Sequence, residues 1–481
     1  MISFPELTIA KTKELFLSGE LSARELVSHY LEEIKEKDSS LNAFREVFDD
    51  AFRQAEDVDK KIKHGDTPRR VEGVPFAIKD NILIEGKMLG AASKILEGYT
   101  ASYDATVIKK LRQQGAIFLG RTNMDEFAMG SSTENSAYGP TKNPFDETRV
   151  AGGSSGGSAT AVRAGMALSA LGSDTGGSIR EPAAFCAVVG LKPTYGSVSR
   201  NGLIAMASSL DQIGPITKTV EDAEIIFDVI RGRDPNDSTT LDIKSEESGT
   251  KNQVRTIGIP KEYFSLREGG KEGLDEDVAK KIQEAVNFLE EKKFEIKEVS
   301  LPTTSYALAS YYIVMPAEVS ANLARFEGMR YGLREPGENL FEVYAKTRGA
   351  GFGPEVRRRI ILGAYVLSAG YYEAYYARAQ KVRYLVRKDF EDTFREVDIL
   401  LAPVTPHPAF KIGEKIKDPL SMYLEDVLTV PINLAGVPAL SVPFGFVERD
   451  VKKLPVGVQL IAPWSEESRL FEVGKILEEK T

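Results

Sequence analysis

Ala151-Gly152-Gly153-Ser154-Ser155-Gly156-Gly157-Ser158-Ala159 and Gly172-Ser173-Asp174-Thr175-Gly176-Gly177-Ser178-Ile179-Arg180 are two Gly/Ser-rich stretches in which Ser154 and Ser178 lie 24 residues apart. Glycines open backbone conformations that are closed to other residues, so several N–H groups can converge on one point. N–H groups at the start of a helix hold an anion or a developing oxyanion. We therefore expect each stretch to be a loop that leads into a helix, with Ser178 as an exposed nucleophile beside its oxyanion hole.

A third element lies upstream, where an apolar run ends in a lysine: Gly73-Val74-Pro75-Phe76-Ala77-Ile78-Lys79-Asp80-Asn81. Each element alone has an ordinary explanation, because Gly/Ser loops are usually plain turns and a lysine at a strand end is usually solvated. The glycines also allow a phosphate-binding loop. The three elements together are far more specific for catalysis than any one of them.

The rest of the chain alternates between short apolar runs and helical patterns, which is typical of an α/β fold with a mostly buried sheet. Strands are expected at 74–78, 116–119, 167–171, 257–259, 399–402, 439–442 and 456–461, and helices at 220–230, 278–289, 356–387 and 467–477. Residues 1–70 are expected to be helical. Ser22 and Glu25 form a capping box there, and a second helical stripe is expected from Phe44 to Ile62.

Composition excludes several classes of protein. The net charge of -9 argues against a surface devoted to nucleic acid. We find no apolar run long enough to span a membrane, and we expect no signal peptide. The single cysteine, Cys186, cannot form an internal disulfide, which fits a cytoplasmic location. With three His and one Cys, a Ser-His-Asp triad and a His/Cys metal site are both disfavoured, and no P-loop motif is present.

The combination of Lys79 with the two Gly/Ser loops resembles the amidase signature family, and the stretches 190–196 and 209–215 match it as well. The resemblance implies an α/β amidase-signature fold, with a central mixed β-sheet covered by helices on both faces and a helical N-terminal region. It also implies a Ser-cisSer-Lys triad. Ser178 would be the nucleophile, Ser154 the bridging serine and Lys79 the base. The backbone N–H groups of Thr175, Gly176, Gly177 and Ser178 would form the oxyanion hole.

Two further stretches, 351–360 and 418–423, are similar to one branch of that family, the glutaminase A subunits of tRNA-dependent amidotransferases. This resemblance implies glutamine as the substrate. Arg359 of the run Arg357-Arg358-Arg359 would bind its carboxylate and Asp426 its ammonium group, and Tyr311 would form a hydrogen bond with the substrate. The ammonia released would pass to a B subunit that binds tRNA, ATP and Mg²⁺ and amidates Glu-tRNA(Gln) or Asp-tRNA(Asn), and a small C subunit would brace the pair. No metal or cofactor is expected in this chain itself.

The proposed base requires an unusual lysine. An ordinary lysine has a pKa near 10.4, so only about one in 10³ is neutral at pH 7. Burial at the end of the run 74–78 could lower the pKa of Lys79 by desolvation. A carboxylate facing the amine would oppose this effect, so we expect the Asp80 side chain to point elsewhere.

We expect one amidase-signature domain over residues 1–481. Within it, residues 1–70 form the helical N-terminal part, 71–231 the catalytic core, 232–253 a polar surface excursion, and 254–481 a second lobe that completes the substrate pocket. Two alternatives remain open at this stage: a stand-alone amidase acting on another carboxylic amide, and a non-catalytic scaffold with anion-holding loops. Arg359 and Asp426 could also be plain surface ion pairs on helices.

Overall fold

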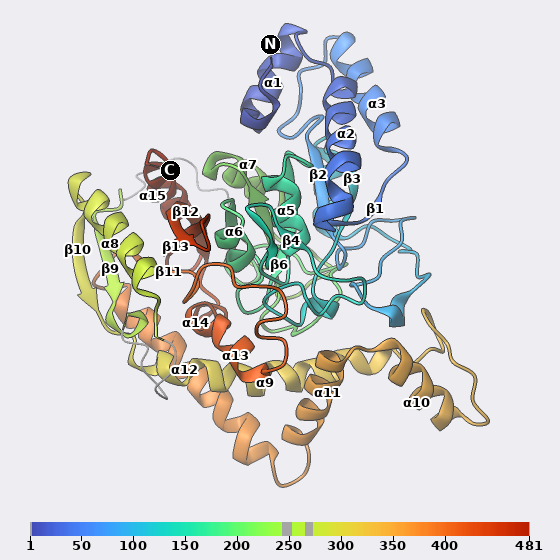
Figure 1. Cartoon of the computed structure of the whole chain (residues 1–481), viewed down its shortest axis with the longest axis vertical. Helices are drawn as coiled ribbons and strands as arrows, with labels where there is room; N and C mark the ends of the chain where they lie inside the picture. Colours follow the sequence, from blue (N-terminus) through green and yellow to red (C-terminus); the bar gives the residue numbers. More distant parts are fainter. Residues whose placement is uncertain (1, 243–252, 265–272, 481) are drawn as a thin grey trace.

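The protein is built on one large mixed sheet, described here from a computed structural model that covers residues 2–242, 253–264 and 273–480 (Figure 1). The strand order is β1-β3-β2-β6-β8-β7-β12-β13-β11-β9-β10. The strands span β1 (Phe44–Val47), β2 (Pro75–Lys79), β3 (Ile117–Thr122), β6 (Ser169–Asp174), β7 (Val189–Lys192), β8 (Gln212–Thr217), β9 (Thr256–Pro260), β10 (Glu295–Val299), β11 (Ile399–Pro403), β12 (Ala439–Arg449) and β13 (Lys452–Ile461). A separate small hairpin pairs β4 (Lys142–Asn143) with β5 (Asp146–Val150).

The two halves of the chain are joined inside this sheet. Strand β2 runs parallel to β3 and β6, β6 runs antiparallel to β8, and β8 pairs with β7. The link to the second half is the antiparallel pairing of β7 with β12, in which Leu191 faces Leu440. Because a strand from residues 1–231 is hydrogen-bonded to a strand from residues 254–480, the two described halves share one sheet.

Helices pack on both faces of the sheet. They are α1 (Ile9–Ser18), α2 (Ala23–Leu41), α3 (Ala51–Lys63), α4 (Thr106–Gln113), α5 (Gly156–Arg163), α6 (Arg180–Phe185), α7 (Val220–Ile230), α8 (Glu276–Glu291), α9 (Ala307–Asn322), α10 (Leu340–Gly351), α11 (Pro354–Val366), α12 (Ala377–Thr393), α13 (Pro419–Tyr423), α14 (Val430–Ala435) and α15 (Glu467–Glu478). Successive side chains of a strand point to opposite faces. On β12, Leu440 lies against Gly474 of α15, whereas Ser441 lies beside Gly457, which packs on Ala184 of α6. The expected α/β architecture is therefore confirmed.

Helices α9, α11 and α12 gather at one end of the molecule, below the sheet in Figure 1. Helix α9 packs on both α11 and α12, and α14 packs on α9 and α12. The short 3-10 helix η8 (Leu424–Leu428) connects α13 to α14 in the same region. This helical layer lies next to the loop between β6 and α6, which contains Ser178.

Two of the expected helices are wrong in part. Residues 44–47 form the edge strand β1, because Phe44 and Val47 pair with β3, and the helix begins only at Ala51. The single helix expected over 356–387 is two helices, α11 and α12, separated by residues 367–376. Gly370 has a φ of +85° there, a conformation that continues no helix. The capping box is confirmed, since the Ser22 hydroxyl accepts from the Glu25 N–H at 3.1 Å.

The first part of the expected polar excursion is packed on the core. Asp234 accepts a hydrogen bond from the Ser199 hydroxyl at 2.6 Å, and Asp237 accepts from the Arg200 N–H at 2.8 Å. Both aspartates are buried. Residues 243–252 of the same expected excursion lie outside the described residues.

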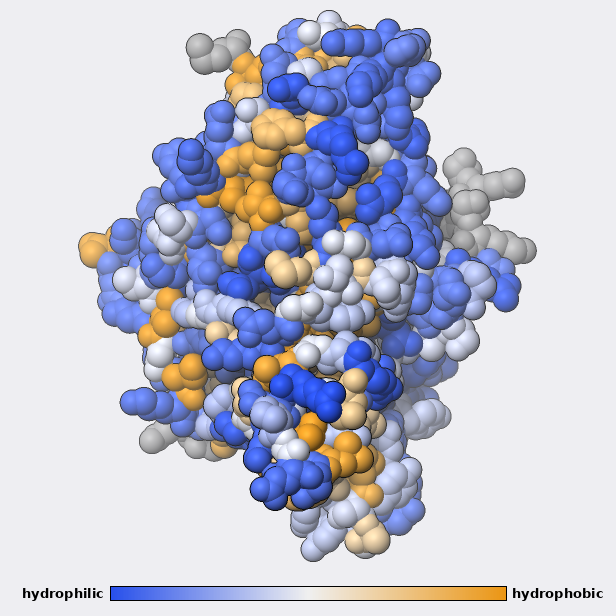
Figure 2. All heavy atoms as spheres, turned by 90° about the vertical axis from the view of Figure 1, so that its right-hand side faces the viewer, coloured by the Kyte–Doolittle hydropathy of each residue, from blue (hydrophilic) through white to orange (hydrophobic). Residues whose placement is uncertain are grey.

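The outer surface is mainly hydrophilic on the face drawn in Figure 2, with hydrophobic residues showing in several separate places. The hairpin of α11 and α12 exposes large apolar side chains, including Ile361 and Tyr384. None of the helices within 2–242, 253–264 and 273–480 combines the length and the apolar character that a membrane crossing requires.

Candidate active site

Lys79 is the last residue of β2, a strand that is buried along its whole length, and its side chain is fully buried. Its Nζ lies 2.7 Å from Ser154 Oγ, 2.8 Å from Ser155 Oγ and 3.1 Å from the Ser173 carbonyl oxygen. Burial lowers the pKa of the Lys79 amine to about 7, against the opposing effect of more distant carboxylates. About half of the molecules then hold a neutral amine at pH 7, as a general base requires.

The contacts of the amine also determine which way protons can move. The Ser155 hydroxyl donates to the Ser173 carbonyl at 3.2 Å, so it can only accept from Lys79. A neutral amine has two N–H donors, which Ser155 Oγ and the Ser173 carbonyl occupy. Its lone pair is then left for the proton of the Ser154 hydroxyl. A protonated amine would donate to all three oxygens, so the same contacts serve both protonation states.

Asp80 points away from the amine, as expected. Its carboxylate accepts hydrogen bonds from the backbone N–H groups of Gly90 at 3.1 Å and Ala92 at 3.0 Å. It also forms an ion pair with Arg121 at 2.7 Å. These three partners hold the Asp80 carboxylate away from the Lys79 amine. Desolvation therefore remains the main influence on the pKa of Lys79.

Ser154 lies on the first Gly/Ser loop, just before α5, and is fully buried. The peptide bond between Gly153 and Ser154 is cis. A side chain at Gly153 would collide with the Asp125 carboxylate and with the backbone N–H of Ser132. Glycine is therefore required at this position so that the loop can approach the segment 125–133 closely.

Ser178 lies on the second loop, between β6 and α6, with 7% of its surface exposed. Its carbonyl oxygen accepts a hydrogen bond from the Ser155 N–H at 3.0 Å, which joins the two Gly/Ser loops directly. The structure thus brings Lys79, Ser154 and Ser178 into one buried region. Their catalytic roles stay a prediction.

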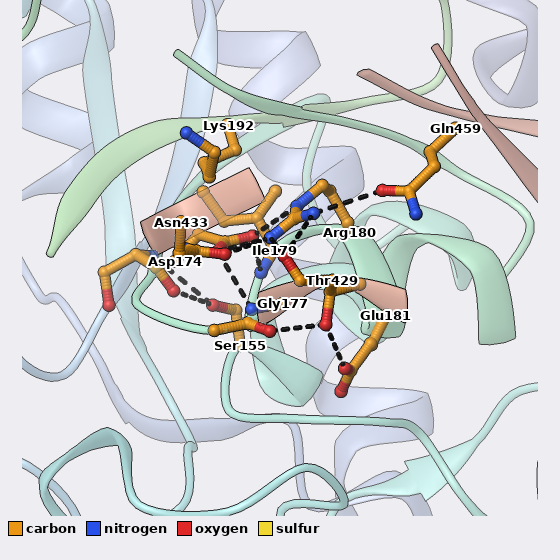
Figure 3. A network of polar contacts seen from close by, with 12 residues as sticks. Ser155, Asp174, Gly177, Ile179, Arg180, Glu181, Lys192, Thr429, Asn433 and Gln459 are labelled. Carbon is orange, nitrogen blue, oxygen red and sulfur yellow. Dashed lines mark hydrogen bonds and ion pairs between the residues drawn. The ribbon is translucent and has the colours of Figure 1, made fainter. Parts of the chain in front are cut away.

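A buried ion pair shapes the Ser178 loop (Figure 3). The Asp174 carboxylate accepts from the N–H groups of Gly177 at 3.0 Å and Ile179 at 3.1 Å, and it pairs with Arg180 at 3.0 Å. Burial alone would raise the pKa of Asp174, but the Arg180 guanidinium beside it lowers that pKa to about 2. A permanent negative charge therefore fixes the backbone on both sides of Ser178.

The same pair connects the loop to the second half of the chain. The Asn433 amide donates to Asp174 at 2.9 Å, and Arg180 donates to the side chain of Gln459 at 3.1 Å and to the Thr429 carbonyl at 3.3 Å. In the sequence, Asp174 and Arg180 are recognisable only as part of the loop motif. No local sequence pattern points to Asn433 or Gln459, because their contacts with Asp174 and Arg180 span more than 250 residues.

The predicted oxyanion hole needs revision at one position. The Gly177 N–H already donates to Asp174, so it is not available to a substrate in this arrangement. Among the described residues, no acceptor takes a hydrogen bond from the N–H groups of Thr175, Gly176 or Ser178. These three donors are the ones that remain for a developing oxyanion.

Arg359 is the one buried arginine of its run, since Arg357 and Arg358 are exposed. Its guanidinium donates to Glu355 at 2.7 Å and lies over the rings of Tyr312 and Tyr423, each centred 5.4 Å away. The interpretation of Arg359 as a surface ion pair is therefore wrong. The role of Arg359 in binding the substrate carboxylate stays a prediction.

Asp426, on η8, is also buried. Its carboxylate accepts from the hydroxyls of Ser131 and Tyr312, both at 2.6 Å. Burial raises the pKa of Asp426, and these hydrogen bonds counter the rise. Tyr312 thus touches both Asp426 and Arg359, and sequence reasoning missed it. Its one available signal was its place beside Tyr311 on an apolar helix.

Tyr311 lies against the nucleophile loop. A Cβ atom at Gly176 would come within 2.6 Å of the Tyr311 hydroxyl, so this glycine allows the phenol to reach the backbone of the loop. Tyr311 is buried, and burial raises the pKa of its hydroxyl well above the usual value. It therefore stays a neutral hydrogen-bond donor.

A cavity of about 450 Å³ reaches Arg359 and Tyr423, although Lys79, Ser154 and Ser178 are not among its lining residues. Its lining includes Glu126, Glu134, Glu355, Arg358, Arg359 and Tyr423. Contacts then continue from Arg359 through Tyr312 to Asp426. The volume is within the range of small-molecule sites, and the lining mixes cationic with acidic groups. Such a site suits a small zwitterion better than an apolar amide.

The site combines a buried lysine, which is hydrogen-bonded to a serine, with a glycine-rich loop that contains a second serine. This combination is typical of amide-hydrolysing enzymes. The family model described as Amidase matches residues 25–471, so the chain belongs to the amidase family. This confirms the predicted family.

The chain is similar over nearly its full length to the A subunits of glutamyl-tRNA(Gln) amidotransferases. It is 52% identical to the one from Roseiflexus castenholzii, covering 98% of this chain and 94% of the relative. It is 51% identical to the subunit from Picosynechococcus sp., covering 97% of this chain and 96% of the relative. The crystal structure of the counterpart from Thermotoga maritima matches with a TM-score of 0.80 at 43% identity, covering 100% and 96% of the two chains.

A peptide amidase from Stenotrophomonas maltophilia has the same fold, with a TM-score of 0.82 at 28% identity and coverage of 100% and 98%. The higher identity to the amidotransferase subunits favours the amidotransferase interpretation over the stand-alone amidase. The predicted class of enzyme is confirmed.

Proposed function

We propose that this chain hydrolyses the side-chain amide of glutamine as the A subunit of a tRNA-dependent amidotransferase. The single observation that supports this most strongly is the 2.7 Å contact between the fully buried Lys79 amine and the Ser154 hydroxyl. The buried cation of Arg359 and the buried anion of Asp426, bridged by Tyr312, support an α-amino acid as the substrate.

In the proposed reaction, Ser178 Oγ attacks the amide carbon of glutamine. The Ser178 proton passes to Ser154 as Ser154 gives its own proton to Lys79. The N–H groups of Thr175, Gly176 and Ser178 are the donors proposed to hold the oxyanion. When the C–N bond breaks, the relay returns a proton to the leaving nitrogen, which departs as ammonia. Water then attacks the γ-glutamyl ester on Ser178 through the same relay, which releases glutamate and restores the serine.

The ammonia would be used by a partner. We assign tRNA, ATP and Mg²⁺ to a B subunit, which would convert Glu-tRNA(Gln), Asp-tRNA(Asn) or both into the amidated forms, and we assign a bracing role to a small C subunit. The names of the relatives support a multi-subunit assembly. We assign no cofactor to this chain itself, and we expect it to act in the cytoplasm.

The test is a glutaminase assay of the purified chain, alone and with candidate B and C subunits and misacylated tRNA. Glutamine turnover is expected to rise when the partners and tRNA are present, and Ser178→Ala should abolish it under every condition. Fast partner-independent hydrolysis of simple aliphatic amides, with glutamine ignored, would favour the stand-alone amidase instead. Normal function of Ser178→Ala would favour the non-catalytic scaffold.

A further inference from the structure

A second buried carboxyl group lies beside Asp426 and has no part in the proposed reaction. Glu181, in the first turn of α6, is 1% exposed. Its Oε1 lies 3.1 Å from the Thr429 hydroxyl (Figure 3), and that hydroxyl lies 3.1 Å from the carbonyl oxygen of Asp426. A side chain at Gly177 would collide with the Glu181 carboxyl. Glu181 therefore fills the space between the Ser178 loop and the candidate ammonium site.

The charges around Glu181 are mostly negative. Asp426 and Glu425 face it from η8, and Asp174 faces it from the end of β6. The nearby cations are engaged with other groups. Arg180 pairs with Asp174, Lys415 pairs with Glu425, and Arg359 pairs with Glu355. Within the described part of the chain, no cation forms an ion pair with Glu181.

Two adjacent carboxyl groups that lack a cation cannot both ionise easily, so one of them keeps a proton. The hydrogen bonds decide which one. Asp426 receives dedicated donors from Ser131 and Tyr312. Glu181 receives only the Thr429 hydroxyl, which also lies within hydrogen-bond distance of the carbonyl oxygens of Gly176 and Asp426. The negative charge therefore belongs on Asp426 and the proton on Glu181.

We propose that Glu181 acts as a neutral hydrogen-bond donor to Asp426 and thereby sets the preference for substrates that have an α-ammonium group. The donated bond orients the Asp426 carboxylate and confines one negative charge to the position that the ammonium would face. This inference rests on the proposed function, because it assigns Asp426 to the ammonium of glutamine. Glu181 is a positioning residue, since it acts through Asp426.

The test compares two substrates in two variants. Glutaramate has the amide and carboxylate of glutamine but lacks its α-amino group, so it reports on every contact except the ammonium site. Glu181→Leu, which cannot donate, is expected to raise KM for glutamine roughly 10- to 100-fold, the range for hydrogen bonds to charged groups. KM for glutaramate and kcat for both substrates should stay within about threefold of the native values. Glu181→Gln keeps a donor of the same size and should recover most of the lost affinity for glutamine.

Two contrary outcomes are distinguishable from each other. Equal losses on glutamine and glutaramate in Glu181→Leu, or no recovery in Glu181→Gln although its thermal unfolding is native, would show a purely structural role and overturn the inference. If Glu181→Leu does not fold, the comparison of Glu181→Gln with Glu181→Ala takes its place. A native enzyme that turns over glutaramate as efficiently as glutamine, or that ignores glutamine, would instead contradict the proposed function.

Discussion

Lys79→Arg would replace the buried amine by a guanidinium that cannot lose its proton in a protein. In the native site, burial lowers the pKa of the Lys79 amine from 10.5 to about 7. This change raises the neutral fraction at pH 7 from about one in 10³ to about one half, and it corresponds to about 5 kcal/mol of bias against the charged form. The guanidinium stays charged at every accessible pH, so the variant has no base to offer.

The assay is ammonia release from glutamine as a function of pH. Because the base must be neutral, native kcat/KM should rise about tenfold per pH unit below 7 and level off above it, so that the value at pH 5 is about 1% of the plateau. Lys79→Arg should lower kcat by about 10³-fold or more and should show no midpoint near pH 7. Circular dichroism and thermal unfolding would check that the variant folds.

Lys192 offers a matched control. It is also fully buried, and burial together with Arg180 lowers the pKa of its amine to about 7, but its Nζ donates to the Pro193 carbonyl at 2.9 Å. Lys192→Met should keep the midpoint of the native pH profile. The reasoning is refuted if native activity is the same at pH 5.5 and pH 8, or if Lys79→Arg retains a tenth of native kcat.

Three further substitutions test other contacts. Ser154→Ala removes the hydroxyl next to the amine and should lower kcat by about 10²- to 10⁴-fold with little change in KM, whereas a loss confined to KM would contradict a proton relay. Asp174→Asn leaves the buried Arg180 guanidinium without its charge partner, so the free energy of unfolding in urea should fall by about 3–5 kcal/mol, and a fall below about 1 kcal/mol would show that the pair is not needed. Tyr312→Phe removes the 2.6 Å hydrogen bond to Asp426 and should raise KM for glutamine about tenfold at near-native kcat; a change in kcat alone would argue against a binding role.

Much of the fold could be predicted from local patterns. The apolar runs became β2, β3, β6, β9, β11, β12 and β13, because strands buried on both faces read as continuous hydrophobic segments. Phe44 was misassigned because its apolar spacing is compatible with a helix, and only pairing with β3 makes it a strand. The break at Gly370 was missed because a long amphipathic pattern continues on both sides of it.

The residues of the candidate site also fall into two groups, those that local motifs predict and those that only the packing reveals. Lys79, Ser154 and Ser178 lie in motifs whose residue types suggest chemistry directly. Glu181 and Tyr312 become meaningful only when η8 is packed against α6 and α9, which places Asp426 between them. Interactions across that many residues leave no local periodicity, so a single sequence could not reveal them.

The hydrogen bonds that hold the Ser178 loop have a consequence for the order in which the enzyme is synthesised and becomes active. Lys79, both Gly/Ser loops and the nucleophile are translated before residue 181, but Asn433 and Gln459, which hydrogen-bond to Asp174 and Arg180, are translated more than 250 residues later. A ribosome-bound chain that ends before β13 contains Lys79, Ser154 and Ser178. It lacks the hydrogen bond from Arg180 to Gln459 that helps to shape the Ser178 loop. We expect such nascent chains not to hydrolyse glutamine, so that ammonia is first released only after β13 has been synthesised and has paired with β12.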